Sequence, residues 1–126
     1  MISFDDVRRH VEHFGGRATL VTVTDAGTPH VVSAIVGVGD AVFTADVGNR
    51  TRANLSARPG VCLVWEPVAD VADGEYQLIL DGTAHALGEP DGSGIGAVSI
   101  RVTSGIMHRL AGLPSGPSTC LALSDT

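Results

Sequence analysis

The sequence contains no lysine, so all eight of its basic residues are arginine. Acidic residues number 14, and the formal net charge is -6. A negative overall field argues against binding to nucleic acid or to an anionic membrane through net charge. Aromatic residues make up 4% of the chain, which leaves few rings on which bases could stack. An anionic ligand must therefore be held by a local arrangement of arginines.

Cysteine is scarce as well, and the two cysteines, Cys62 and Cys120, stand far apart without a CxxC pattern. This usage indicates neither a disulfide framework nor a zinc ribbon. Cys62 lies in an apolar run and is expected to be a buried small hydrophobe. No apolar stretch reaches the roughly 18 residues that a membrane-spanning helix needs, and the first residues do not follow a secretory-leader pattern. We therefore expect a cytoplasmic protein.

Hydrophobic residues make up 44% of the 126 residues and charged residues 17%, which suits one packed domain. A first helix is predicted after Ser3, a good cap, and Gly15-Gly16 ends it. A second short helix is predicted after Asn49, another good cap, and Pro59-Gly60 ends it. Gly82 indicates a bulge or corner in a long strand. The composition and turn signals predict strands over 18–24, 30–38, 41–45, 61–65, 76–87 and 97–103.

Many of these segments carry Val, Leu or Ile on both faces, which suits a small closed barrel better than a sheet with one wet face. The sequence therefore predicts a mostly β, α+β domain. Its architecture is a six-stranded, mostly antiparallel barrel with two or three short helices, which spans residues 1–126. Residues 114–126 are expected to form an irregular tail. Trp65 is expected in the core, because apolar residues surround it.

The chemically most informative segment lies between Val47 and Trp65. It holds no acidic residue and three arginines: Arg50, Arg52 and Arg58. A strand end that leads through Gly48 into a helix presents free N–H groups and the positive end of the helix dipole. Arg50 in the first turn adds a planar set of donors suited to a phosphate. On the local pattern alone, the simpler interpretation is that these arginines are solvated helix residues and Asn49 is only a cap.

An ordered set of motifs resembles the phosphate-binding part of the pyridoxamine 5'-phosphate oxidase-like flavin-binding split barrels. The resemblance covers about residues 14–88 and, more weakly, 97–109, and it depends on the order of the pieces because no single piece is specific. In chain order the motifs are the hairpin 18–29, Phe43-Thr44, Arg50-Thr51, Asn54-Leu55, Arg58-Pro59, the strand 61–65 and the long strand segment 77–84 with its Gly-small pair.

The resemblance implies a single flavin-binding split-barrel domain that forms a homodimer, with FMN at the interface, and oxidises or reduces a small molecule. By position, Arg50 and Thr51 would bind the phosphate, with Asn54 nearby. Thr44 would contact the ribityl or phosphate end, and Gln77 would come from the other subunit. Backbone groups of the second strand would follow the isoalloxazine edge: Val32, Ser33, Ala34 and Ile35. No catalytic residue is assigned, because the flavin ring carries the redox chemistry.

The chain departs from the family at its lysine positions. The family commonly pairs its phosphate-binding arginine with a lysine, where this chain has Thr51, and a second lysine on the second strand is replaced near Gly37. Phosphate neutralisation would therefore depend on Arg50, on Arg52 and on the helix terminus. The C-terminal substrate segment of the vitamin B6 oxidases is missing from this chain, so that activity is not expected.

Two alternatives follow from the same resemblance, because some relatives of this barrel use a deazaflavin coenzyme and others bind haem. One is a deazaflavin-dependent reductase, and the other is a non-enzymatic flavin or haem binder or sensor. A deazaflavin has a longer anionic tail, for which the additional candidates are Arg17, Arg101 and Arg109. The pair His108-Arg109 could close over a ligand or form an exposed strand end.

Other classes of site lack support in the sequence. His10 and His13 stand on the polar face of the first helix with Glu12, but no third ligand follows, so a solvated face is predicted and no metal site. No histidine lies in a pattern that marks a haem ligand. The serine-hydrolase, Walker and Rossmann motifs are absent.

Overall fold

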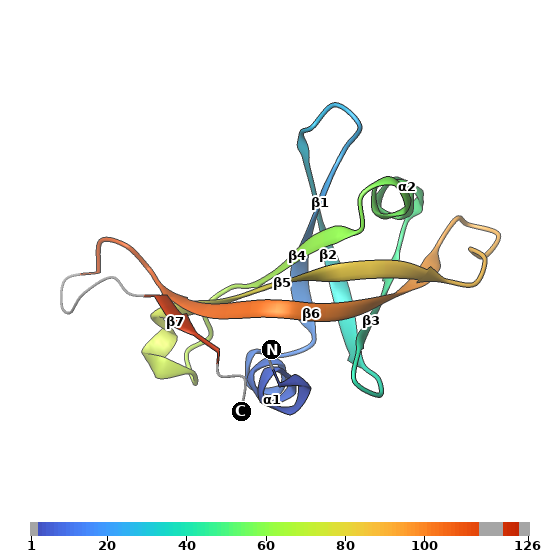
Figure 1. The fold of residues 1–126 in the computed structure, drawn as a ribbon. Helices are drawn as coiled ribbons and strands as arrows, with labels where there is room; N and C mark the ends of the chain where they lie inside the picture. The colour runs from blue at the N-terminus through green and yellow to red at the C-terminus, as the bar shows by residue number, and fades with distance from the viewer. Residues whose placement is uncertain (1–2, 114–119, 124–126) are drawn as a thin grey trace.

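A computed structural model of the chain describes residues 3–113 and 120–123 (Figure 1). Within these ranges, two α-helices, one short 3₁₀ helix and seven strands follow one another. Their bounds are α1 (Phe4–Phe14), β1 (Arg17–Val23), β2 (Pro29–Val38), β3 (Phe43–Val47), α2 (Asn49–Ala57), β4 (Gly60–Trp65), η1 (Ala72–Gly74), β5 (Tyr76–Leu87), β6 (Gly96–Arg109) and β7 (Cys120–Ala122).

Six of the strands close into a barrel. Their order is β3-β2-β1-β4-β5-β6, and pairing of β3 with β6 closes the ring. Every neighbouring pair is antiparallel. The predicted fold class, a mostly β, six-stranded antiparallel barrel with short helices, is confirmed.

The elements differ from the predicted ones mainly in length and in the addition of β7. β3 begins at Phe43 rather than at residue 41, because Ala41 has a positive φ of 63° and belongs to the preceding turn. β6 continues past Thr103 to Arg109, because it pairs with β5 as far as Tyr76. Within the predicted irregular tail, Cys120–Ala122 pair with β6 as β7. The rest of that tail beyond residue 113, apart from Leu123, lies outside the described residues.

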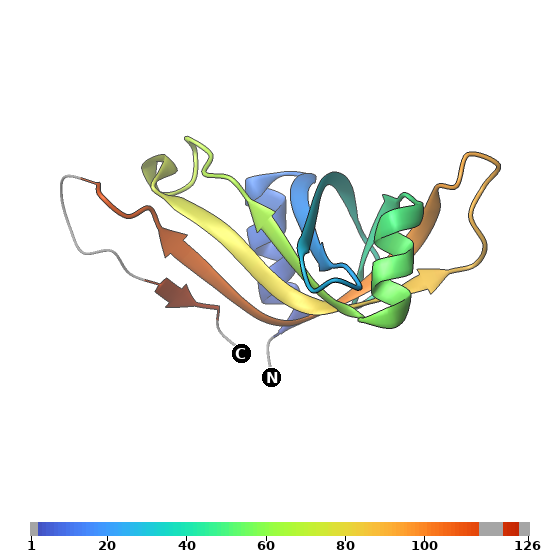
Figure 2. The same ribbon diagram turned by 90° about the horizontal axis from the view of Figure 1, so that it is seen from above.

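The helix α1 begins and ends as the sequence predicts. The hydroxyl of Ser3 accepts a hydrogen bond from the Asp6 N–H, and Gly15, with a φ of 102°, follows the last helical residue. α1 buries Val7, Val11 and Phe14 against the barrel. It lies well away from α2, as both views show (Figures 1 and 2). No helix in the described ranges is long and apolar enough to cross a membrane.

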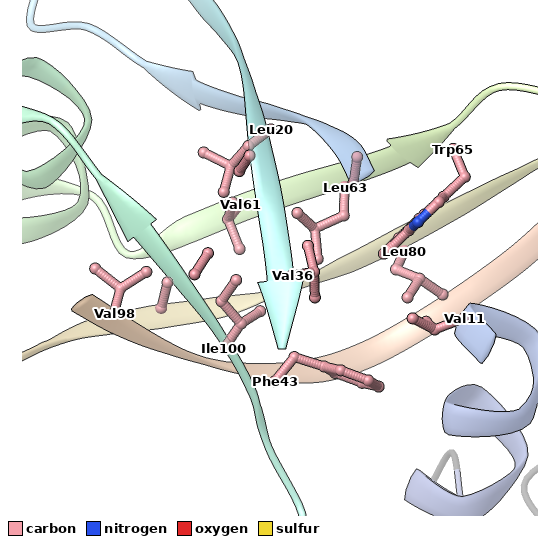
Figure 3. Packing of buried hydrophobic residues seen from close by; sticks show 14 of the residues in the cluster. Val11, Leu20, Val36, Phe43, Val61, Leu63, Trp65, Leu80, Val98 and Ile100 are labelled. Carbon is pink, nitrogen blue, oxygen red and sulfur yellow. The ribbon is translucent and has the colours of Figure 1, made fainter. Parts of the chain in front are cut away.

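The core fills the inside of the barrel and extends to α1 (Figure 3). Alternate residues of β1 and β4 point inward, which the burial of Ala18 and Leu20 on β1 illustrates. Trp65 is 1% exposed, and its Nε1–H donates to the Gly15 carbonyl at 2.8 Å. The predicted core position of Trp65 is therefore confirmed, and its one polar atom is paired with the chain that leaves α1.

The predicted irregularity at Gly82 is confirmed. The register between β5 and β6 shifts between Asp81 and Gly82. The two backbones approach so closely there that a Cβ on Gly82 would collide with the carbonyl oxygen of Arg101. Glycine is thus required at the point where the two longest strands bend around the barrel.

We predict that Gly82→Ala lowers the free energy of unfolding by about 1–3 kcal/mol, because the added methyl group must displace the β6 backbone. Urea denaturation measures the change. Gly60→Ala is the matched control, since a Cβ on Gly60 of β4 meets nothing within 4 Å. Equal stabilities of the two variants would contradict the role given to Gly82.

Candidate functional site

A cavity of about 450 Å³ lies where β2, β3 and the start of α2 meet. We call it the α2 cavity. Its walls include four of the residues predicted to bind a cofactor: Val32, Ser33, Arg50 and Thr51. They also include residues that the sequence did not single out as ligands, namely His30, Asp46 and Ile95. The structure therefore brings together the predicted phosphate-binding pair and part of the second strand.

The N-terminus of α2 faces this cavity without a capping side chain. Gly48 occupies the cap position and makes no side-chain hydrogen bond, and the first turn of α2 carries no acid. The prediction that Asn49 caps the helix is wrong. Because β3 extends to Val47, Gly48 takes the cap position and Asn49 is the first helical residue. The first-turn N–H groups of α2 are thus open to an anion.

Three side chains at the α2 cavity are suited to an anionic ligand. Arg50 is exposed, and among the described residues it makes no ion pair or side-chain hydrogen bond. Thr51 is 2% exposed and lines the cavity. The Nδ1 atom of His30 is buried and has no hydrogen-bond partner in the described structure. A buried polar atom without a partner costs about 1–3 kcal/mol, and a hydrogen bond to a ligand would remove this cost.

A second hollow adjoins the first along the outer face of β2. This cleft of about 580 Å³, here the β1–β2 cleft, is lined by Ser33, Ala34 and Ile35 together with Arg17 of β1 and the end of β4. Ser33 lines both hollows, so they meet there. Ser33 and Ile35 point outward, and Ile35 is 71% exposed, whereas the side chains of Val32 and Ala34 turn toward the core.

Three predicted residues, Thr44, Gln77 and Asn54, line neither hollow. Thr44 stands opposite Gly37, and its Oγ1 occupies the space that a Cβ at position 37 would need. A side chain at position 37 would therefore require the Thr44 hydroxyl to move. Gln77 lies near the start of β5, whereas α2 packs near His85. At about 3.3 Å per residue these two positions are roughly 26 Å apart, so Gln77 does not reach the α2 cavity of its own chain.

Asn54 is buried between α2 and the barrel. Its Nδ2 donates to the Oγ1 of Thr22 on β1 at 3.0 Å, and the two residues are 9% and 1% exposed. The amide that the sequence places beside a phosphate is thus used inside the fold, where it fixes α2 on β1. His30 is the register partner of Thr22, so this contact also borders the site.

We predict that Asn54→Ala lowers the free energy of unfolding by about 1–3 kcal/mol, because it leaves the buried Thr22 hydroxyl without its partner. Thr22→Val serves as the second arm of a double-mutant cycle, measured by chemical denaturation. The hydrogen bond predicts a double variant that is less destabilised than the sum of the two single changes. Strict additivity would show that the two side chains do not interact.

The arginines divide into two groups. Four form ion pairs with acids: Arg8, Arg9, Arg58 and Arg109. The other four, Arg17, Arg50, Arg52 and Arg101, make no ion pair with a described residue, and the first three of them line cavities. Arg109, a candidate for an anionic cofactor tail, is 5% exposed and contacts Glu75 at 3.3 Å. Its neighbour His108 contacts the Cys120 sulfur at 3.2 Å.

Neither cysteine lines the α2 cavity. Cys62 is half-buried rather than fully buried as expected, because it points to the outer face of β4. Burial and the neighbouring Asp81 raise the pKa of the Cys62 thiol to about 11. The thiol therefore stays protonated at neutral pH and is a poor nucleophile.

Metal-ligating side chains do not gather in the described part of the chain. No group of three or more His, Cys, Asp or Glu residues there could hold a metal ion. On α1, the Nδ1 of His10 contacts the Asp6 carbonyl oxygen at 2.8 Å. The ring is thus hydrogen-bonded to its own helix.

The chain is similar in fold to several proteins of known structure. No protein-family model matches the chain, and no curated protein does. A solved structure from Clostridium acetobutylicum, a protein related to general stress protein 26 of the pyridoxinephosphate oxidase family, is similar with a TM-score of 0.67 and 16% identity over 95% of this chain and 92% of that one. HutZ, the haem storage protein of Vibrio cholerae, has a TM-score of 0.60 and 13% identity over 82% and 92%. An F420 reductase is similar with a TM-score of 0.55 and 18% identity, over 71% of this chain and 87% of that one.

These likenesses define a class of fold. The chain has the split-barrel fold of the pyridoxamine 5'-phosphate oxidase-like proteins, as the sequence motifs indicate. Structures with this fold include an F420 reductase and haem-binding proteins. At 11–18% identity the likeness concerns the fold, so the function must be argued from the site.

Proposed function

We propose that the chain binds FMN in the α2 cavity and the β1–β2 cleft and works as a flavin-dependent oxidoreductase on a small molecule. One observation carries this proposal. Arg50, which makes no ion pair with a described residue, the buried Thr51, His30 with its unpartnered Nδ1, and the uncapped start of α2 all line one cavity of about 450 Å³.

The residues of the two hollows suit the phosphate, the ribityl chain and the ring of FMN in turn. Arg50 and the first-turn amides of α2 suit a phosphate, which carries negative charge and several acceptors. The orphaned Nδ1 of His30 can bond to a phosphate or ribityl oxygen. The one acid on the cavity wall, Asp46, is able to accept hydrogen bonds from ribityl hydroxyl groups. The flat apolar ring suits the outer face of β2, where Ser33 and Ile35 project into the adjoining cleft.

Bound FMN supplies hydride and electron transfer, and the protein supplies binding, orientation and exclusion of water. The residues around the α2 cavity would bind the cofactor. Arg50 and Thr51 would hold one end of the molecule, while β2 offers backbone groups in a fixed row along the other. The cleft on β2 is open to solvent on one side, so a further surface is needed to exclude water from the ring.

A second copy of the chain supplies such a surface. The outer face of the barrel has an apolar row across neighbouring strands, because Val64, Ile79 and Ile106 are register partners. Val31 and Ile35 extend the apolar face and are 58% and 71% exposed. An exposed apolar face of this kind is typical of an interface. Gln77 lies on the same outer face, so in a homodimer it can approach the cleft of the partner.

We predict that Arg50→Gln weakens FMN binding by about 10- to 100-fold, because a charge-assisted hydrogen bond contributes about 1.5–3 kcal/mol. Titration monitored by flavin fluorescence measures the affinity. The free energy of unfolding of the ligand-free variant should change by less than about 0.5 kcal/mol, since Arg50 is exposed.

Arg101→Gln is the matched control, because Arg101 is exposed on β6 and lines no described cavity near α2. Parallel titrations with the deazaflavin F420 and with haem separate FMN from the alternative cofactors. Equal FMN affinity of the wild type and Arg50→Gln would remove Arg50 from the site. Binding of F420 or haem without FMN binding would overturn the choice of cofactor.

A further inference from the structure

A third cavity lies under α2, on the side away from the α2 cavity. It has a volume of about 260 Å³ and is formed by α2, the end of β5 and the start of β6. We propose that this cavity, the Arg52 pocket, is a second anion-binding site that takes the carboxylate or phosphate group of a small ligand. The residues that would recognise the ligand are Arg52, Ser56 and His85.

The state of Arg52 is the main observation. Its Nε atom is buried and has no hydrogen-bond partner in the described structure. Arginine keeps its charge in proteins, and a buried charged donor without an acceptor is unfavourable. Half of the arginines are paired with an acid, such as Arg58 with Asp25 at 2.7 Å, whereas Arg52 has no acid partner among the described residues. At Arg52 the missing acceptor is one that a ligand can supply.

The side chain of Arg52 is held in place by its surroundings. A Cβ on Gly96 would lie 2.9 Å from the Nε of Arg52, so β6 passes directly against the guanidinium stem. Figure 2 shows the loop that joins β5 and β6 beyond α2, and Asn49 of α2 touches Gly94 in that loop. This packing fixes the arginine before a ligand arrives, which reduces the entropy lost on binding.

The charge of the pocket favours an anion. Its lining contains a guanidinium, an imidazole and a hydroxyl group, and no Asp or Glu, although the chain as a whole has a net charge of -6. Leu55, Pro59 and Val98 form an apolar wall. These features suit a compact organic acid or phosphate whose anionic group contacts Arg52 while its body rests on the apolar wall.

The Arg52 pocket is independent of the proposed FMN site. The two cavities share no lining residue, and Arg50 and Arg52 belong to different ones. FMN binding in the α2 cavity and anion binding in the Arg52 pocket can therefore be tested separately. Arg50→Gln tests the first, and Arg52→Gln tests the second.

The test is an NMR titration of the whole chain with inorganic phosphate and, in a second arm, with butyrate, at constant ionic strength. The Arg52 Nε–H signal and the His85 ring signals are followed. We expect a saturable shift of both, which Arg50→Gln leaves unchanged and Arg52→Gln abolishes at His85. A saturable shift with one of the two anions defines the preferred group. Absence of a saturable shift with both anions would overturn the proposal.

His85→Gln and Ser56→Ala keep the proposal testable if Arg52→Gln does not fold, because His85 and Ser56 are both exposed. We expect each variant to weaken the anion affinity, measured from the shift of the Arg52 signal, by roughly threefold or more, because one polar contact is lost. FMN affinity should stay unchanged in both. Unchanged anion affinity in both variants would show that the anion does not occupy this pocket.

Discussion

The antiparallel pairing of β3 with β6 is the constraint on which the rest of the structure depends. It closes the barrel, and its last register pair, Val47 with Gly96, fixes the point at which the chain leaves β3 for α2. One side of α2 then faces β2 across the α2 cavity, and the other faces the end of β5 across the Arg52 pocket. Both candidate sites are therefore set by one strand pairing. The buried hydrogen bond from Asn54 to Thr22 holds α2 in that position.

Arginine is the only basic residue type besides histidine in this lysine-free chain. The arginines that form ion pairs and those that line cavities lie in different parts of the structure. Some arginines form ion pairs on α1, at the first hairpin and beside Glu75. Arg17, Arg50 and Arg52 instead line three different hollows. The planar guanidinium suits this second use, because its donors match the acceptors of a phosphate or carboxylate. The net charge of -6 therefore says little about the binding of small anionic ligands, because such ligands interact with the few groups that surround them.

The sequence predicts much of the fold but only part of the candidate site. Strand order in the chain, the helix cap at Ser3, the core position of Trp65 and the bulge at Gly82 all follow from local signals. Arg50 and Thr51 could be named because they lie in one short motif. His30 as a site residue, and a separate pocket at Arg52, could not be predicted. Each depends on a buried nitrogen without a partner among the described residues, and distant segments decide this. The hydrogen bond from Asn54 could not be predicted for the same reason, since its partner Thr22 lies 32 residues away.

The central claim is that an anionic flavin binds at the start of α2 across two copies of the chain. A crystal structure of the protein grown with FMN tests it most directly. The account predicts the phosphate beside Arg50 and the start of α2, with the Nδ1 of His30 bonded to the ligand. It also predicts the ring along Ser33 and Ile35, with Gln77 from a second copy beside it. FMN bound at another surface, or an α2 cavity that stays empty at saturating FMN, would contradict the account.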